Sequence, residues 1–216
     1  MLRILLTFIC CFFASMAFAA EDIESPASSD EPAYLYTEAP DDRTLGSEDA
    51  PNTLIVYASN TCPHCGHWFN KEWPIIKRDL IETGKLRFVF RPFPTQPAQL
   101  SLTGFMMAEC AADDDYMIVM EDQFARQEAI LSAPDGNAIR AEYNAIAELS
   151  GLNNEAEITA CLNNQAHYDA LEAITQKAQA AEIRGVPAFI FDGQIMKGAQ
   201  DAAAVKAWVE GRSSQP

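Results

Sequence analysis

Basic residues are scarce in this chain: 15 lysines and arginines stand against 31 aspartates and glutamates, giving a formal net charge of -16 over 216 residues. A surface this acidic repels phosphate groups, so the composition argues against a nucleic acid as partner. Hydrophobic residues make up 49% of the chain and charged residues 21%, as in ordinary globular proteins. The length suits one well-packed domain or a domain with a large insertion.

The chain also lacks an apolar run long enough for a confident membrane span. An apolar run over residues 4–18 follows the positive charge of Arg3, and small residues at Ala17 and Ala19 fit a cleavage site. This pattern is typical of a secretory signal peptide over residues 1–19, and a retained membrane anchor is the alternative. We therefore expect an exported protein.

Cysteines are few. Cys10 and Cys11 lie inside the signal segment, so the exported chain keeps four: Cys62, Cys65, Cys110 and Cys161. An even number in an exported protein indicates disulfides. Cys110 and Cys161 both fall in segments with helical periodicity, so we expect them to form a structural disulfide. Two buried, unpaired thiols are the alternative.

The first half of the chain has the pattern of an α/β protein. Residues 20–42 are rich in acids, Ser, Pro and Ala, which predicts a flexible acidic leader. Residues 53–59 (TLIVYAS) are a continuous apolar run, typical of a buried central strand. A helix is expected to begin directly after this strand and to kink at Pro74, and residues 86–93 alternate as a second strand.

The second half begins with a long segment, residues 95–183, that has almost no strand signal and several helical stripes. Gly151 is a natural helix C-cap there, and Asn153 or Asn154 can begin the next helix. Asp192-Gly193 then predicts a hairpin turn, and a last helix is expected over residues 201–210. This order of elements requires a parallel crossover, so the predicted fold class is α/β.

The chemistry is concentrated at Cys62-Pro63-His64-Cys65. Two cysteines separated by two residues can be half of a zinc site, but a second ligand pair at suitable spacing is not recognisable, and we expect no metal. The other common use is redox exchange, which fits a motif that follows an apolar strand and opens a helix.

The position of the motif explains its reactivity. The unpaired N–H groups and the positive dipole at a helix N-terminus stabilise a thiolate, so Cys62 should be exposed and its pKa lowered. Cys65, one turn further along, should face inward. His64 can add positive charge or a hydrogen bond to the Cys62 sulfur, although a lone histidine is more often a surface residue without a role.

The segment Thr61-Cys62-Pro63-His64-Cys65, with Gly185-Val186-Pro187-Ala188 far downstream, resembles the DsbA family of periplasmic thiol oxidases. The resemblance covers about residues 43–209 and implies a thioredoxin fold with a large all-helical insertion. The core would then comprise residues 43–94 and 184–211, with the insertion at 95–183 between them.

The resemblance also implies a cis peptide between Val186 and Pro187, facing the redox pair at the substrate-binding site. An ordinary trans proline is the alternative. One position departs from the wider pattern: thioredoxin-like proteins often hold a buried acid six residues before the first cysteine, and that residue is Val56 here. The proton carrier during exchange therefore stays open.

The implied activity is a disulfide oxidase that donates the Cys62–Cys65 disulfide to reduced or unfolded exported proteins, without metal or organic cofactor. A membrane quinone-linked reoxidase of the DsbB type would restore the disulfide. A disulfide isomerase or reductase of the same fold is the alternative, followed by a non-catalytic client-binding chaperone. We expect a monomer, because residues 20–42 lack the apolar stripe of a dimerisation domain.

Overall fold

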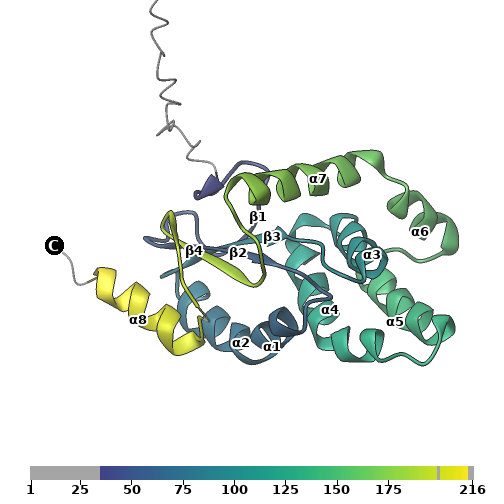
Figure 1. Cartoon of the computed structure of the whole chain (residues 1–216), viewed down its shortest axis with the longest axis horizontal. Coiled ribbons are helices and arrows are strands. Elements are labelled where there is room, and N and C mark those ends of the chain that lie inside the picture. The colour runs from purple at the N-terminus through teal and green to yellow at the C-terminus, as the bar shows by residue number, and fades with distance from the viewer. Residues whose placement is uncertain (1–34, 199, 214–216) are drawn as a thin grey trace, which may run out of the picture. The chain divides into compact units, whose positions relative to one another are not determined.

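Five strands form one mixed sheet in the order β1-β3-β2-β4-β5 (Figure 1). The computed structural model describes residues 35–198 and 200–213 of the chain. The strands are β1 (Arg43–Leu45), β2 (Thr53–Ala58), β3 (Arg87–Pro92), β4 (Ala188–Phe191) and β5 (Gln194–Ile195). β2 and β3 pair in parallel and the other neighbours pair antiparallel.

The central strand is β2, as its continuous apolar run predicts. It pairs with β3 on one side and β4 on the other, so that Val56 lies opposite Phe90 and Phe189. A strand with two partners and helices over both faces has no solvent-facing side, which explains the lack of polar alternation. The parallel β2–β3 pair confirms the predicted α/β class.

The helix after β2 is interrupted, not merely bent. α1 (Pro63–Lys71) ends before Glu72, and α2 (Trp73–Ile76) continues into a π-helical turn (Lys77–Ile81). The break lies two residues before Pro74, whose ring excludes a regular hydrogen bond at that point. The predicted disturbance is therefore confirmed near Pro74, whereas the π-helical turn was not predicted.

The predicted helical segment holds five α-helices and a short 3-10 turn: α3 (Ala98–Glu109), the turn (Asp113–Asp115), α4 (Tyr116–Leu131), α5 (Gly136–Leu149), α6 (Glu155–Leu162) and α7 (Gln165–Ala180). Asn154 caps α6 by accepting a hydrogen bond from the N–H of Glu157 at 3.0 Å. Gly151 has φ +80, as its place after α5 requires.

The predicted hairpin turn is confirmed between β4 and β5, where Asp192 has φ 44 and Gly193 has φ 80. Positive φ at both central positions is the signature of a tight hairpin turn. The side chain of Asp192 also accepts a hydrogen bond from the N–H of Thr53 at 2.7 Å, which joins the turn to the start of β2. α8 (Ala202–Ser213) follows, three residues longer at its end than predicted.

Helices cover both faces of the sheet (Figure 1). α1, α2 and α8 cover the face that carries Val56, in a core rich in aromatic rings such as Phe69, which stacks on Phe124 of α4 at a centroid distance of 3.9 Å. α7 covers the opposite face, where Ile174 and Ala178 join Ile55 of the sheet.

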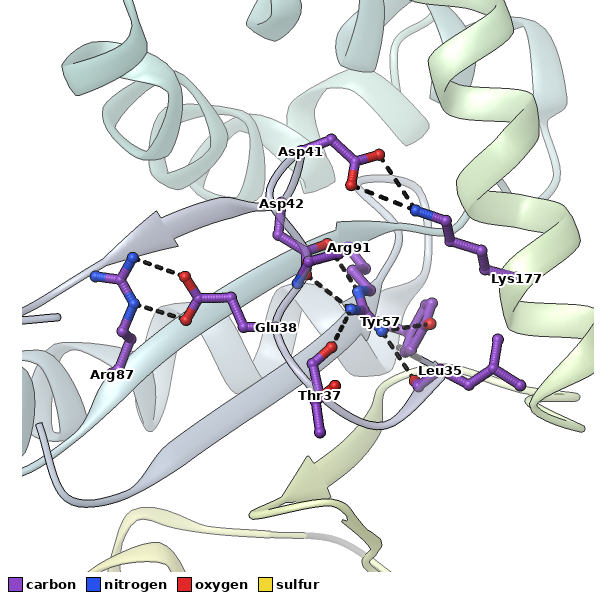
Figure 2. A network of polar contacts seen from close by, with 10 residues as sticks. Leu35, Thr37, Glu38, Asp41, Asp42, Tyr57, Arg87, Arg91 and Lys177 are labelled. Carbon is purple, nitrogen blue, oxygen red and sulfur yellow. Dashed lines mark hydrogen bonds and ion pairs between the residues drawn. The ribbon is translucent and has the colours of Figure 1, made fainter. Parts of the chain in front are cut away.

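Residues 35–42, which we call the N-terminal strap, lie across the same face as α7 (Figure 2). The guanidinium group of Arg91, fully buried in β3, donates to both carboxylate oxygens of Asp42 and to the carbonyl oxygens of Leu35 and Thr37. It also donates to the hydroxyl of Tyr57 at 3.0 Å.

The expectation of a flexible leader over residues 20–42 is therefore wrong for the strap. Leu35 is completely buried, and the ion pair between Asp42 and Arg91 closes the strap against the sheet. Composition could not show this, because a segment with one buried leucine and one paired acid has the same composition as an acidic segment that is exposed to solvent. The rest of the leader and the expected signal peptide lie outside the described residues. Within the described residues, no helix is long and apolar enough to span a bilayer.

Candidate active site

Cys62 stands at the N-cap of α1, at the end of the short loop that follows β2. Its backbone is extended, with φ -85 and ψ 118, and Pro63 occupies the first helical position. Because a helix N-terminus presents unpaired N–H groups, this is where a thiolate gains most from the backbone. Both cysteines of the motif are free thiols in the structure; Cys62 is partly exposed, whereas Cys65 is completely buried.

The two thiols have opposite ionisation behaviour. A hydrogen bond from the Cys65 thiol, with further ones from the backbone N–H groups of Cys65 and His64, lowers the pKa of Cys62 to about 6 against the opposing effect of burial. The charge of His64 acts in the same direction. Burial raises the pKa of Cys65 instead, and its sulfur accepts a hydrogen bond from the N–H of Ser59 at 3.4 Å. The pair thus combines one ready thiolate with one protonated thiol.

The loop before β4 lies directly against the redox pair. The peptide bond between Val186 and Pro187 is cis, as expected, and the thiol of Cys62 donates to the carbonyl oxygen of Val186 at 3.4 Å. Both loop residues are partly exposed. A second cis peptide, Gln96–Pro97, was not predicted.

Two cavities flank α1 near the motif. One, of about 530 Å³, lies between the exposed side of α1 and the loop before β4; its lining includes His64, Trp68, Val186, Pro187 and Met196. The other, of about 610 Å³, lies between α1 and α4. The lining of the first is mostly apolar and includes Val186, whose carbonyl oxygen accepts from the Cys62 thiol. An extended peptide there would therefore have backbone groups of the loop within reach.

Buried amides around the redox loop were missed by sequence reasoning. Asn60, Gln123 and Gln127 are each at most 7% exposed and contact one another or the loop. A signal was available, because Gln123 and Gln127 are one helical turn apart on either side of the buried Phe124. Polar residues at buried helical positions are normally hydrogen-bonded to something specific.

Val56, at the position where thioredoxin-like proteins often hold a buried acid, is buried in the aromatic core. A buried ion pair, Arg91 with Asp42, lies on the other face of the sheet beside Tyr57 (Figure 2). Because successive residues of a strand point to opposite faces, this pair is separated from Cys65 by the sheet itself. It does not replace the missing acid.

Cys110 and Cys161, expected to pair, are joined by a disulfide with a Cα–Cα distance of 6.1 Å. The bond links the C-cap of α3 to α6. The zinc alternative would need a second pair of ligands beside Cys62 and Cys65, and Cys110 and Cys161 are bound to each other. Among residues 35–198 and 200–213 no cluster of three His, Cys, Asp or Glu side chains is arranged to hold a metal ion.

Comparison with known proteins extends these observations. A family model described as thioredoxin matches residues 38–211. A Rickettsia bellii protein, provisionally named a protein-disulfide oxidoreductase, is 28% identical over 153 residues, and a Rickettsia typhi protein with a similar name is 28% identical over 153 residues. Each match covers 70% of this chain but only 57% and 55% of the relative, so the chain spans little more than half their length.

Solved structures show the same fold. Wolbachia pipientis alpha-DsbA1 superposes with a TM-score of 0.72 at 23% identity, covering 83% of this chain and 94% of that one. Bacillus subtilis BdbD gives 0.69 at 18% identity, with 81% and 94% covered. A protein-disulfide isomerase from Novosphingobium aromaticivorans gives 0.68 at 21% identity, with 81% and 98% covered. The chain has the DsbA-like form of the thioredoxin fold, with its helical insertion, and belongs to the thioredoxin family.

Proposed function

We propose that the chain is a protein thiol–disulfide oxidoreductase that works as an oxidase, donating the Cys62–Cys65 disulfide to reduced client proteins. The observation that carries this proposal is the opposed ionisation of the pair: a partly exposed Cys62 with its pKa lowered to about 6, beside a buried Cys65 with its pKa raised. A stabilised thiolate favours the reduced form, which makes the disulfide a better oxidant.

The exchange takes place in two displacements. A client thiolate attacks the Cys62 sulfur of the Cys62–Cys65 disulfide, and Cys65 leaves with the electron pair of the broken bond and takes up a proton. A second client thiolate then attacks the client sulfur of the mixed disulfide and expels Cys62 as a thiolate. The client gives up two electrons and the two protons of its thiols; Cys65 keeps one proton, and the other goes to solvent.

The residues around the pair have supporting roles in this proposal. His64 contributes positive charge near the Cys62 sulfur, and Val186 with Pro187 presents backbone groups to an extended client segment. The protein would be exported to the periplasm by residues 1–19 and would work as a monomer on reduced exported proteins. A membrane quinone-linked reoxidase of the DsbB type would restore the disulfide.

Isomerase activity is the second candidate, favoured by the fold shared with the Novosphingobium aromaticivorans protein-disulfide isomerase. The deciding experiment gives the purified chain a reduced and a scrambled form of one multi-disulfide protein. Rapid oxidation of the reduced form with poor recovery of the scrambled form supports the oxidase. The reverse pattern supports an isomerase, and light scattering on the same sample tests the monomer.

A further inference from the structure

The loop that carries Cys62 is held from outside the thioredoxin core, by α4. The side-chain amide of Gln127 donates one hydrogen bond to the carbonyl oxygen of Asn60 at 2.8 Å and another to that of Cys62 at 3.0 Å. Both amide hydrogens are therefore used on the main chain of the redox loop. Gln127 is 7% exposed, so water does not compete strongly for these bonds.

A second glutamine, Gln123, lies one helical turn earlier and forms a hydrogen bond with the side chain of Asn60 in the same loop. Gln123 accepts from the amide of Asn60 at 2.8 Å and donates to the carbonyl oxygen of Gly104 at 2.9 Å. Ser101 donates to Asn60 as well, at 2.9 Å. Asn60 is thus fixed on two sides by the helical segment, while Gln127 acts on the backbone that leads to Cys62.

Gln127 also lies against the first turn of α1. A Cβ atom added to Gly66 would lie 2.1 Å from the Gln127 side-chain oxygen, so the amide fits this place only because residue 66 is glycine. The N–H of Gly66 donates to the Cys62 carbonyl oxygen at 3.0 Å, which makes that oxygen the acceptor for both α1 and α4.

The direction of this carbonyl matters to the sulfur. Rotation about the Cα–C bond of Cys62 moves the carbonyl oxygen and, with it, the whole first turn of α1 relative to the Cys62 side chain. Cys62 has no side-chain capping bond that would limit the rotation. A second hydrogen bond on the carbonyl, from a separate helix, therefore holds the N–H groups of His64 and Cys65 in line with the sulfur.

We propose that Gln127 is a positioning residue for thiol–disulfide exchange: from α4 it fixes the Cys62 carbonyl, so that the first N–H groups of α1 stay directed at the Cys62 sulfur. This inference rests on the proposed redox function of the pair. It assigns the helical segment a direct part in tuning the redox centre, in addition to packing around it.

The test compares Gln127→Met, which keeps the length of the side chain and removes both donors, with the unaltered protein. The pH titration of the Cys62 thiolate is followed by its ultraviolet absorbance, and the equilibrium with glutathione is measured on the same samples. We expect a roughly tenfold fall in the thiolate-to-thiol ratio at fixed pH and a less oxidising disulfide, because one pKa unit corresponds to a tenfold change.

Gly66→Ala approaches the same contact from α1, since its methyl group displaces the end of a flexible side chain and leaves α4 unaltered. It should raise the Cys62 pKa in the same direction. The matched control is Asn70→Ala, which removes another amide-to-carbonyl bond between α1 and α4, from Asn70 to Phe124 at 2.9 Å, without contacting the redox loop. Unfolding in urea is measured for all three variants.

Unchanged thiolate titration and glutathione equilibrium in both Gln127→Met and Gly66→Ala would overturn the inference. An equal change in Asn70→Ala would do so too, because it would show a general effect of α1–α4 packing. If either Gln127→Met or Gly66→Ala unfolds, the other variant, which alters the other helix, is used in its place. None of these readouts uses a client, so a protein that fails to oxidise clients would refute the proposed oxidase and leave this comparison valid.

Discussion

The sulfur of Cys62 lies 3.4 Å from the carbonyl oxygen of Val186, which is 124 positions further along the chain. The sheet explains this contact: β2 and β4 are antiparallel neighbours, with Tyr57 opposite Ala188, so the residues just after β2 meet those just before β4. A client segment bound along the Val186 loop would therefore have its own thiol close to the one sulfur of the pair that is accessible.

Alkylation of the reduced protein should follow the ionisation of Cys62 alone. Because the thiolate is the nucleophile, the rate is expected to rise with a midpoint near the Cys62 pKa of about 6, while the buried Cys65 stays unmodified. Mass spectrometry of samples quenched across a pH series measures both sites. A midpoint in the range of an ordinary cysteine would remove the basis of the proposed mechanism.

The same lowered pKa makes the stability of the reduced protein depend on pH. The fold stabilises the Cys62 thiolate, so the contribution is fully present above the pKa of the unfolded thiol and is lost as pH falls through the folded value of about 6. Relative to reduced Cys62→Ala, the reduced protein should lose free energy of unfolding between roughly pH 9 and pH 5. Urea titrations of both proteins would show a constant difference if the thiolate gained nothing from the fold.

The order of the elements and the redox motif were predictable because they rest on local signals. The apolar run at residues 53–59, the cysteine spacing and the Asp192-Gly193 turn each report on a few neighbouring residues. The strand β1 was missed, since Arg43–Leu45 is short and gains its regular structure only by pairing with β3. Tertiary pairing decides such segments, and no periodicity reveals it.

The supporting side chains of the site were not predictable for a similar reason. Gln127 and Asn60 are 67 positions apart and meet only because α4 packs on α1. Arg91 in an alternating strand reads as a solvent-facing residue, yet the strap covers it and supplies Asp42 as its partner. Long-range polar pairs depend on the packing of whole elements, which a single sequence does not express.

The strap should contribute strongly to stability through one of two adjacent acids. Asp42→Ala leaves the buried guanidinium of Arg91 without its counter-charge and is expected to cost about 3–5 kcal/mol in free energy of unfolding. Asp41→Ala, the matched control, removes a solvent-exposed ion pair with Lys177 and should cost less than about 1 kcal/mol. Urea unfolding of the two variants measures both losses. Equal losses would contradict a special contribution of the buried ion pair between Asp42 and Arg91.

Only two thiols should be free in the reduced, native protein without its first 19 residues: those of Cys62 and Cys65. Replacing Cys110 and Cys161 together by Ser should lower the free energy of unfolding by ~4 kcal/mol on the chain-entropy model, given their separation of 51 residues. Peptide mapping without reductant tests the bond directly. Recovery of both cysteines as free thiols would exclude it and restore the alternative of two buried, unpaired thiols.

The unequal accessibility of the pair leads to the last prediction, a trapped intermediate. In Cys65→Ser, a single-cysteine peptide that joins Cys62 has no neighbouring thiol to displace it, so a one-to-one mixed disulfide should accumulate. In Cys62→Ser the remaining thiol is completely buried and its pKa is raised, so the same peptide disulfide should leave it unmodified. Intact-mass spectrometry without reductant compares the two variants after incubation with that peptide as its symmetric disulfide. Comparable adducts on both variants would show that the peptide reaches Cys65 and that burial does not set the order of the two displacements. The assignment of Cys62 as the attacked sulfur depends on this difference in burial.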